Sequence, residues 1–208
     1  FISLEKAISI QTPPLYLPFG VSTPTEVING CSCDASLRLP DNQREAGKVA
    51  EFEQKMRMLD ARVLEAAAEA GWFGPKVNKD ILAFNFRPVV KQRDDKYPPI
   101  IKFKIPLRDG VPNCSFFDET SKPPRRISMD DICKGDKVRF WAYVDKVWTV
   151  NSTFGITWVV KQVSVTARAP RADEYCMADD DVTGGGEAEA ASADPQGAGG
   201  VGEEDIDP

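Results

Sequence analysis

Cationic and aromatic side chains recur together in the second half of the chain. In the run KVRFWAYV at 137–144 they alternate with apolar residues, so one face of an extended segment would carry them. Cations neutralise phosphates and aromatic rings stack on unpaired bases, which is the combination that a single-stranded nucleic acid requires. The sequence therefore predicts a nucleic-acid-binding face with these candidate contacts: Lys91, Arg93, Lys96, Lys102, Lys104, Arg125, Arg126, Lys137, Arg139, Trp141, Tyr143, Lys146, Trp148 and Lys161.

The aromatic candidates differ in how well they fit a stacking role. Trp141 is the best stacking candidate, because its neighbours on the same face of the alternation are charged. Phe154 and Trp158 fit a core position as well as a stacking surface, and the sequence leaves both readings open.

Catalytic chemistry has little support in the residue types. None of the 208 residues is histidine, which excludes Ser-His-Asp and Cys-His catalysis and histidine-ligated zinc. The acidic pairs Asp94–Asp95 and Asp130–Asp131 could hold Mg²⁺ in a nuclease, but each lies in a turn-like stretch typical of solvated carboxylates. Five cysteines without a CxxC pair favour neither a zinc site nor a disulfide framework. We therefore predict a non-enzymatic protein without metal or cofactor.

The net charge of −6 is the sum of two unlike segments. Residues 1–172 hold 26 basic and 20 acidic residues, whereas residues 173–208 hold 12 acidic residues and no basic one. Such asymmetry is typical of chains that contact nucleic acid or carry a charged interaction arm. Residues 1–171 are predicted to form one domain. Residues 172–208, rich in Gly, Ala, Asp and Glu, are predicted to be a disordered acidic tail, because they cannot bury enough apolar area to offset their ordering entropy.

The acidic tail suggests a mechanism and also an alternative. A tethered polyanion has an effective concentration that reaches roughly the millimolar range, so it would compete with weak ligands for a basic groove and yield to a long single strand. Once displaced, the tail could recruit basic partners. Two other interpretations stay open: RNA as the ligand, and a protein-interaction module that acts through a helix and the tail without a DNA role.

The elements that would position these residues are mostly strands. Apolar residues recur every three or four positions from Val49 to Ala70, and Asn42 with Glu45 fits a capping box, so a helix is predicted over 43–72. A turn is predicted at 151–155 and a long loop at 107–127. About five strands and one long helix, without βαβ repeats or a Gly-rich phosphate loop, favour a small barrel. The predicted strands cover 31–39, 81–91 with a break near Pro88, 100–106, 137–144 and 156–165.

Four sequence blocks carry a resemblance to a known family. They are PPLYLPFG at 13–20, LDARVLEAAAEAGWFG at 59–74, RPVVKQRDDKYPPIIKFKIP at 87–106, and FGITWVVKQVSV at 154–165, which Val147–Trp148 precedes. Together they resemble the single-stranded DNA-binding proteins of large eukaryotic DNA viruses. These in turn are similar to the single-stranded DNA-binding protein of short-tailed phages, an OB-fold with an acidic C-terminal tail.

The resemblance implies an OB-fold barrel that binds single-stranded DNA with little sequence preference, in replication, recombination and repair. It also implies that the acidic tail contacts replication proteins such as polymerase, primase or helicase through Glu203, Glu204, Asp205, Ile206 and Asp207, and it allows for a homodimer. The expected location is intracellular, at the site of DNA replication, in the nucleus or in a viral replication compartment of the cytoplasm. No membrane contact is expected, since no apolar run reaches 18 residues. In one respect the sequence departs from this family. The acidic C-terminal tails of the phage proteins end in an aromatic residue, whereas this chain ends in Ile206-Asp207-Pro208.

Overall fold

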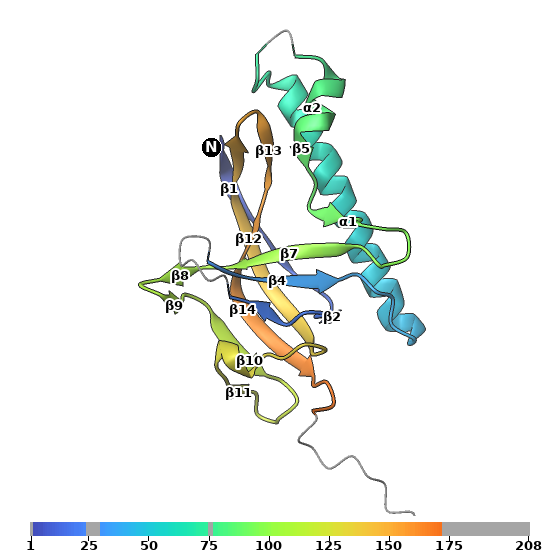
Figure 1. The fold of residues 1–208 in the computed structure, drawn as a ribbon, viewed down its shortest axis with the longest axis vertical. Coiled ribbons are helices and arrows are strands. Elements are labelled where there is room, and N and C mark those ends of the chain that lie inside the picture. The colour runs from blue at the N-terminus through green and yellow to red at the C-terminus, as the bar shows by residue number, and fades with distance from the viewer. Residues whose placement is uncertain (1, 24–29, 75–76, 172–208) are drawn as a thin grey trace, which may run out of the picture. The chain divides into compact units, whose positions relative to one another are not determined.

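A closed ring of five strands forms the centre of the protein (Figure 1). β14 (Trp158–Ala167) pairs in parallel with β7 (Ile100–Ile105), which pairs antiparallel with β4 (Cys31–Ser36). β4 then pairs with β2 (Leu15–Tyr16), β2 with β12 (Lys137–Val150), and β12 closes the ring on β14. Closure leaves the ring without an unpaired edge. The predicted OB-type barrel with one long helix is thus confirmed.

The remaining strands extend this ring, except for one hairpin that forms a separate two-stranded sheet. The computed structural model describes residues 2–23, 30–74 and 77–171, so the predicted tail at 172–208 lies outside the described residues. β1 pairs antiparallel with β12, β13 forms a hairpin with β12, and β10 pairs in parallel with β14. The strands outside the ring are β1 (Ile2–Gln11), β3 (Val21–Ser22), β5 (Phe86–Arg87), β6 (Val90–Lys91), β8 (Leu107–Arg108), β9 (Val111–Pro112), β10 (Ser115–Asp118), β11 (Arg125–Arg126) and β13 (Thr153–Ile156).

The core of the barrel follows from the alternation along its strands. Successive side chains of a strand point to opposite faces, so one set fills the interior. Phe103 of β7 and Phe140 of β12 stack there with ring centroids 4.3 Å apart. Trp158 and Phe154 are both fully buried, which decides their role in favour of the core.

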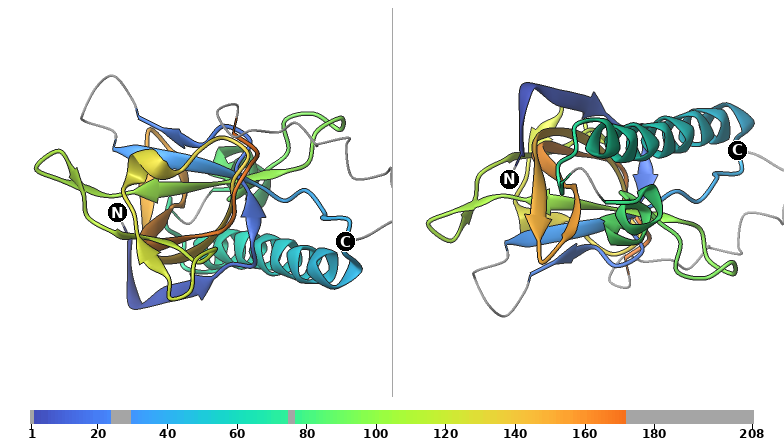
Figure 2. Two further views of the ribbon diagram at one scale, coloured as in Figure 1. Left: turned by 90° about the horizontal axis from the view of Figure 1, so that it is seen from below. Right: turned by 90° about the horizontal axis from the view of Figure 1, so that it is seen from above.

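The long helix α1 (Gln43–Glu69) lies outside the ring, as the two views of Figure 2 show. Asn42 caps it, since its side-chain oxygen accepts hydrogen bonds from the backbone N–H groups of Arg44 and Glu45. Val49, Phe52 and Met56 of the predicted apolar stripe are buried. The buried Asp60 ties the helix to the barrel, because its carboxylate accepts hydrogen bonds from Val89 N–H at 3.0 Å and Val90 N–H at 3.3 Å.

α1 ends three residues before the predicted position at 72. Gly71 has φ +59°, a conformation that stops a helix and that glycine adopts without strain. The N–H of Trp72 donates to the Ala67 carbonyl and that of Gly71 to the Ala68 carbonyl, which together form a Schellman motif. Trp72 and Phe73 then pack against Phe154, with ring centroids 6.4 and 5.0 Å away, so they fix the end of the helix to β13.

The predicted strand at 81–91 is wrong in its first half. Residues 79–85 form α2 (Lys79–Asn85), whose N-terminus is capped by the Asn78 side chain accepting from the Asp80 N–H. A short apolar run does not by itself distinguish a helix from a buried strand, and the Asn78 cap decides for the helix. Only β5 and β6 of this stretch are extended, on either side of Pro88.

Three further segments differ from the prediction. The stretch 107–127 is not a plain loop, because it contains the β8–β9 hairpin together with β10 and β11. The strand predicted over 31–39 ends at Ser36, and Leu39 is exposed rather than buried. The turn predicted at 151–155 is narrower: Asn151 and Ser152 both have positive φ and join β12 directly to β13.

Candidate nucleic-acid interface

The outer face of β12 carries four predicted contact residues. Val138, Phe140 and Ala142 point inward and are fully buried, so the residues between them point outward. This confirms the orientation predicted for Lys137, Arg139, Trp141 and Tyr143. Trp141 is 48% exposed, so about half of its surface is accessible to a base.

Lys161 joins Trp141 and Tyr143 through a β-bulge. Gln162 lies opposite Trp141 and Val160 opposite Ala142, so Lys161 between them has no pairing partner on β12. Its Nζ lies 5.3 Å from the ring centroid of Trp141 and 4.8 Å from that of Tyr143. Both are cation–π distances. We call Trp141, Tyr143 and Lys161 the β12–β14 cluster.

A row of paired residues connects this cluster to β7. Val159 of β14 lies opposite Tyr143 on one side and opposite Lys104 on the other. Paired residues present their side chains on the same face, and adjacent strands lie about 4.8 Å apart. Lys104 is therefore roughly 10 Å from Tyr143 along the outer surface. A phosphate backbone and its bases can contact both at this separation.

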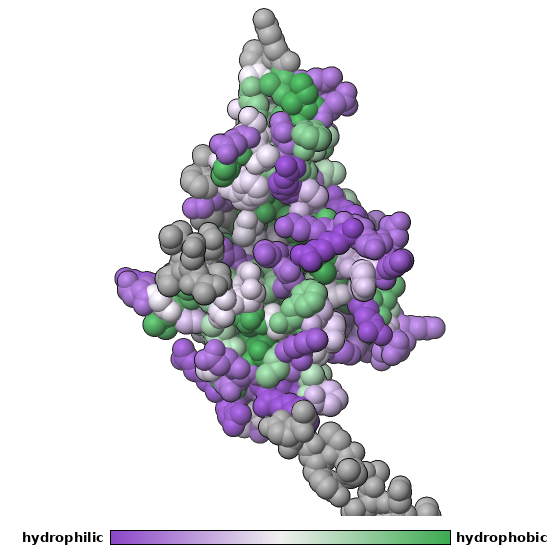
Figure 3. Space-filling view, in the orientation of Figure 1, coloured by the Kyte–Doolittle hydropathy of each residue, from purple (hydrophilic) through white to green (hydrophobic). Residues whose placement is uncertain are grey.

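Lys102 begins a second group on the adjoining surface. It precedes Lys104 by two residues on β7, and both lysines are exposed while Phe103 between them is buried. Lys102, Lys91 and Trp148 line a small cleft of about 90 Å³ together with Arg87. In the space-filling view, hydrophilic side chains gather where Figure 1 shows β7 and the loop that follows β6 (Figure 3).

Asp34 lies among the cations of this second group. It is opposite Lys102 in the β4–β7 pair, with its Oδ1 4.0 Å from Lys102 Nζ and its Oδ2 4.0 Å from an Arg93 nitrogen. Oδ1 is buried and accepts no hydrogen bond. The two cations are 52% and 70% exposed in their side chains, so they remain accessible to a phosphate while Asp34 holds them near the strand.

Trp148 has a fixed position because Gly155 lies directly opposite on β13. A Cβ at residue 155 would be 3.0 Å from the indole ring and 2.7 Å from the Arg87 carbonyl oxygen. Only glycine allows both neighbours to approach this closely. The indole is therefore packed against β13 and lies half-buried in the cleft that Lys91 and Lys102 also line.

Other predicted contacts lie apart from these two groups. Arg125 and Arg126 are exposed on β11, a strand that pairs only with β10 among the described strands. Arg139 is half-buried and 3.8 Å from a Glu119 carboxylate oxygen. The structure therefore brings together only part of the predicted set. Placed elsewhere are Lys137, beside Tyr16 and Glu45; Lys96, in the loop after β6; and Lys146, opposite Ser3 of β1.

Two exposed aromatic residues were missed by the sequence prediction. Phe19 is 63% exposed and Tyr97 is 68% exposed, and both line a cleft together with Lys91 and Arg93. A signal was present for Tyr97, because it stands in the cation-rich stretch KQRDDKY from which only the basic residues were selected. No sequence signal distinguished Phe19, which lies in an apolar, proline-rich segment.

The cysteines and acidic pairs do not form a metal site in the described parts of the chain. No group of three or more Cys, Asp or Glu residues close enough to share an ion occurs there. Burial raises the pKa of Cys33 to about 12 and of Cys114 to about 11, so both thiols stay protonated. Asp94 accepts a hydrogen bond from the Lys96 N–H, and Asp131 accepts one from the Ser128 N–H, which are turn and cap roles.

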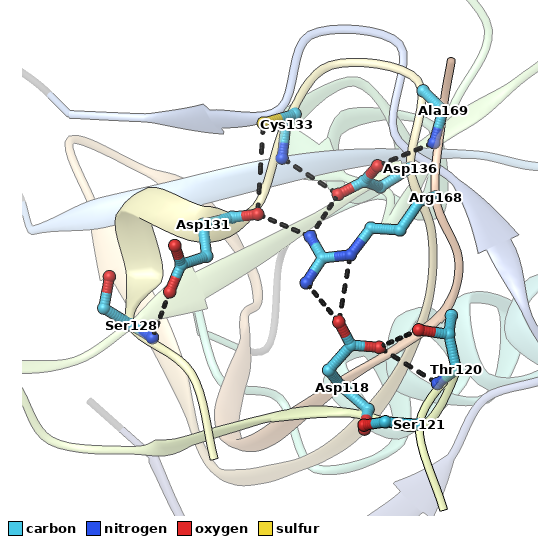
Figure 4. Close-up of polar contacts among 9 residues, drawn as sticks. All are labelled: Asp118, Thr120, Ser121, Ser128, Asp131, Cys133, Asp136, Arg168 and Ala169. Atoms are coloured by element: carbon cyan, nitrogen blue, oxygen red, sulfur yellow. Dashed lines mark hydrogen bonds and ion pairs between the residues drawn. The ribbon is translucent and has the colours of Figure 1, made fainter. Parts of the chain in front are cut away.

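A polar network fixes the end of β14 (Figure 4). The Arg168 guanidinium is 2.7 Å from an Asp118 oxygen and 3.1 Å from an Asp136 oxygen. Burial acts to raise the pKa of Asp118, but hydrogen bonds from Thr120 and Arg168 outweigh it and lower that pKa to about 2. The network joins β10, β12 and β14 immediately before residue 172.

The barrel of this chain is similar in fold to a solved structure. The chain is similar to gp2.5, a single-stranded DNA binding protein encoded by bacteriophage T7, with a TM-score of 0.53 and 11% identity over 81% of this chain and 91% of that one. No family model matches the sequence, and no curated protein matches it either. The phage part of the resemblance is thus supported by the fold, whereas the relation to eukaryotic viruses stays a prediction. Within the described residues no helix is long and apolar enough to cross a membrane.

Proposed function

We propose that this protein binds single-stranded DNA without strong sequence preference. The observation that carries the proposal is the β12–β14 cluster, in which Lys161 lies against two aromatic rings on the outer face. The same face extends across Val159 to Lys104. Stacking contributes about 1–3 kcal/mol per base whatever the base, because every base has a flat face. The barrel that this chain shares with gp2.5 of bacteriophage T7 supports the same reading.

In this proposal the protein is a non-catalytic factor of DNA replication, recombination and repair that acts at the site of replication. Residues 172–208, with 12 acidic side chains, compete with weak ligands for the basic surface and are released when a long single strand binds. The released acidic segment then contacts basic surfaces of replication proteins such as polymerase, primase or helicase.

Titration of tryptophan fluorescence tests the proposal. The four tryptophans include the exposed Trp141, so oligo-dT is expected to quench the emission. The logarithm of the affinity is expected to fall with the logarithm of salt concentration by about 0.7 for each phosphate contacted. Matched RNA and duplex DNA serve as competitors that rank the ligands. No response to any single strand at low salt would exclude the proposal.

A protein-interaction module is the second candidate, and one observation favours it. Met58 of α1 and Ile81 and Phe84 of α2 are all more than half exposed, with Phe84 at 80%. Exposed apolar residues that gather on neighbouring helices are typical of partner-binding surfaces. Replacing Phe84 with Ala is expected to leave oligo-dT affinity unchanged if the barrel face binds DNA. This candidate gains if the protein binds no nucleic acid at low salt.

A further inference from the structure

The cleft beside the loop after β6 is lined by aromatic residues that the barrel core does not explain. Phe19 and Tyr97 face solvent over most of their surface, yet they line a cleft of about 440 Å³ with Pro18, Pro98 and Ile100. Clefts of roughly 300–1,000 Å³ with mainly apolar walls are typical of small-molecule sites. The cleft is large enough for one flat ring system and its substituents.

The wall that carries Tyr97 is held in place by its own loop. The Gln92 side-chain amide donates to the Asp94 carbonyl at 2.6 Å and to the Tyr97 carbonyl at 2.8 Å. The Tyr97 N–H donates back to the Asp94 carbonyl, and the Leu37 N–H donates to the Pro99 carbonyl. These bonds close the loop at both ends, so Tyr97 is exposed on a defined backbone rather than on a free chain.

The opposite wall, which carries Phe19, is anchored to the barrel. The Leu17 N–H donates to the Asp136 carbonyl, and the Gly135 N–H donates to the Leu17 carbonyl at 2.7 Å. Gly20 follows with φ +69°, and a Cβ there would be 3.1 Å from the Lys134 nitrogen. Phe19 therefore projects from a rigid turn. An aromatic ring that is both exposed and preorganised loses little entropy when a ligand binds.

The charges at the cleft define the kind of ligand. Lys91 and Arg93 are exposed at its rim, and Asp94 is the single acidic residue that lines it among the described residues. A ligand that is flat and apolar in one part and anionic in another fits both features. Lys91 also lines the cleft of Trp148 and Lys102, so the two clefts adjoin at this residue.

We propose that this cleft receives one unpaired base of the bound DNA strand, stacked on Tyr97 or Phe19, with the adjacent phosphates at Lys91 and Arg93. The proposal rests on the function proposed above and adds a subsite to it. The cleft lies beyond β7 from the β12–β14 cluster, so it holds a base at one end of the bound segment. The subsite accepts any base, because stacking does not depend on which base is present.

The length dependence of oligo-dT binding tests the subsite on the full-length protein. When the affinity of the wild-type protein is plotted against oligo-dT length, an extra increase is expected at the length at which the oligomer first reaches the cleft. This increase is expected to vanish in the alanine variant of the ring that carries the base, Tyr97→Ala or Phe19→Ala. The longer oligomers then bind on the order of tenfold more weakly, while the shortest oligomers bind as in wild type. Tyr97→Phe keeps the ring and is expected to keep the increase.

Phe84→Ala is the matched control, because Phe84 is even more exposed but lies on α2 and lines none of the clefts that contain these cations. If wild type binds oligo-dT and all three alanine variants keep the same length profile, the subsite is wrong although the function stands. If wild type binds no single strand, the proposed function fails first. Tighter capture of an apolar peptide than of DNA by the cleft would also overturn the proposal.

Discussion

The alternation in the sequence identified which residues of the proposed DNA face point outward. It did not predict how exposed each side chain is or which side chains it contacts. The pattern along β12 correctly placed Trp141 outside and Phe140 inside, because neighbouring residues of a strand must point to opposite faces. The pattern could not predict that a bulge would place Lys161 between Trp141 and Tyr143, since a bulge depends on the pairing of two distant strands. Phe19 was missed for a similar reason, because its exposure results from how the turn at Gly20 packs on Lys134.

Replacing Trp141 with Ala is expected to weaken oligo-dT binding on the order of tenfold. The indole is about half exposed, so its removal creates no cavity and should change the free energy of unfolding by less than about 1 kcal/mol. Fluorescence of the remaining tryptophans measures the binding, and urea denaturation measures the stability. Met58→Ala, an exposed position on α1, is the control. A large loss of stability with unchanged affinity would show that Trp141 serves packing instead.

Elements could be predicted where a periodic pattern was long. The apolar stripe and the Asn42 cap predicted α1 to within three residues at its end, because seven turns repeat the signal many times. α2 is only seven residues long, and its apolar run could equally belong to a strand. The two-residue strands β8, β9 and β11 have too few positions to show an alternation. They pair outside the ring, β8 with β9 and β11 with β10, so the pattern of the ring strands does not predict them either.

The junction of β10, β12 and β14 predicts an acid sensitivity of the barrel. The pKa of Asp118 is lowered to about 2 from an ordinary value near 3.8, so its carboxylate stabilises the fold fully above about pH 4. As the pH falls from about 4 to about 2 this contribution, about 2 kcal/mol, is lost because the unfolded chain takes up the proton first. Asp118→Asn is expected to be less stable than wild type at pH 7, by a difference that shrinks towards pH 2.

Urea denaturation at a series of pH values measures this difference. Asp95→Asn is the matched control, because Asp95 is exposed in the loop after β6 and should leave the free energy of unfolding within about 0.5 kcal/mol of wild type. A difference between Asp118→Asn and wild type that stays constant from pH 7 to pH 2 would contradict the assigned role of the carboxylate. Asp118 would then act through packing rather than through its charge.

The whole molecule combines a basic barrel with an acidic C-terminal segment, and the sequence alone predicted this division. Charge is additive along the chain, so counting suffices to find an excess of six positive charges before residue 173 and 12 negative charges from residue 173 onward. The closed ring was harder to predict, because it depends on pairs such as β7 with β14 that lie more than 50 residues apart. The arrangement depends on burying the apolar side chains of both strands in the interior of the ring.

Removal of residues 173–208 is expected to tighten binding of oligo-dT. A segment that binds its own barrel with a Kd of about 0.1–1 mM, at an effective concentration of about 1 mM, would lower the apparent affinity about 2- to 10-fold. The gain in oligo-dT affinity on deletion should be largest at low salt. Salt screens the attraction of the barrel for the acidic segment as well as its attraction for DNA, so the competition weakens as salt rises. A chain of the same length with the 12 acidic residues of this segment changed to Asn or Gln separates charge from bulk, and it is expected to behave like the deletion. Equal affinities for the full chain, the deletion and the neutral segment would exclude competition and leave this segment a role in partner contact alone.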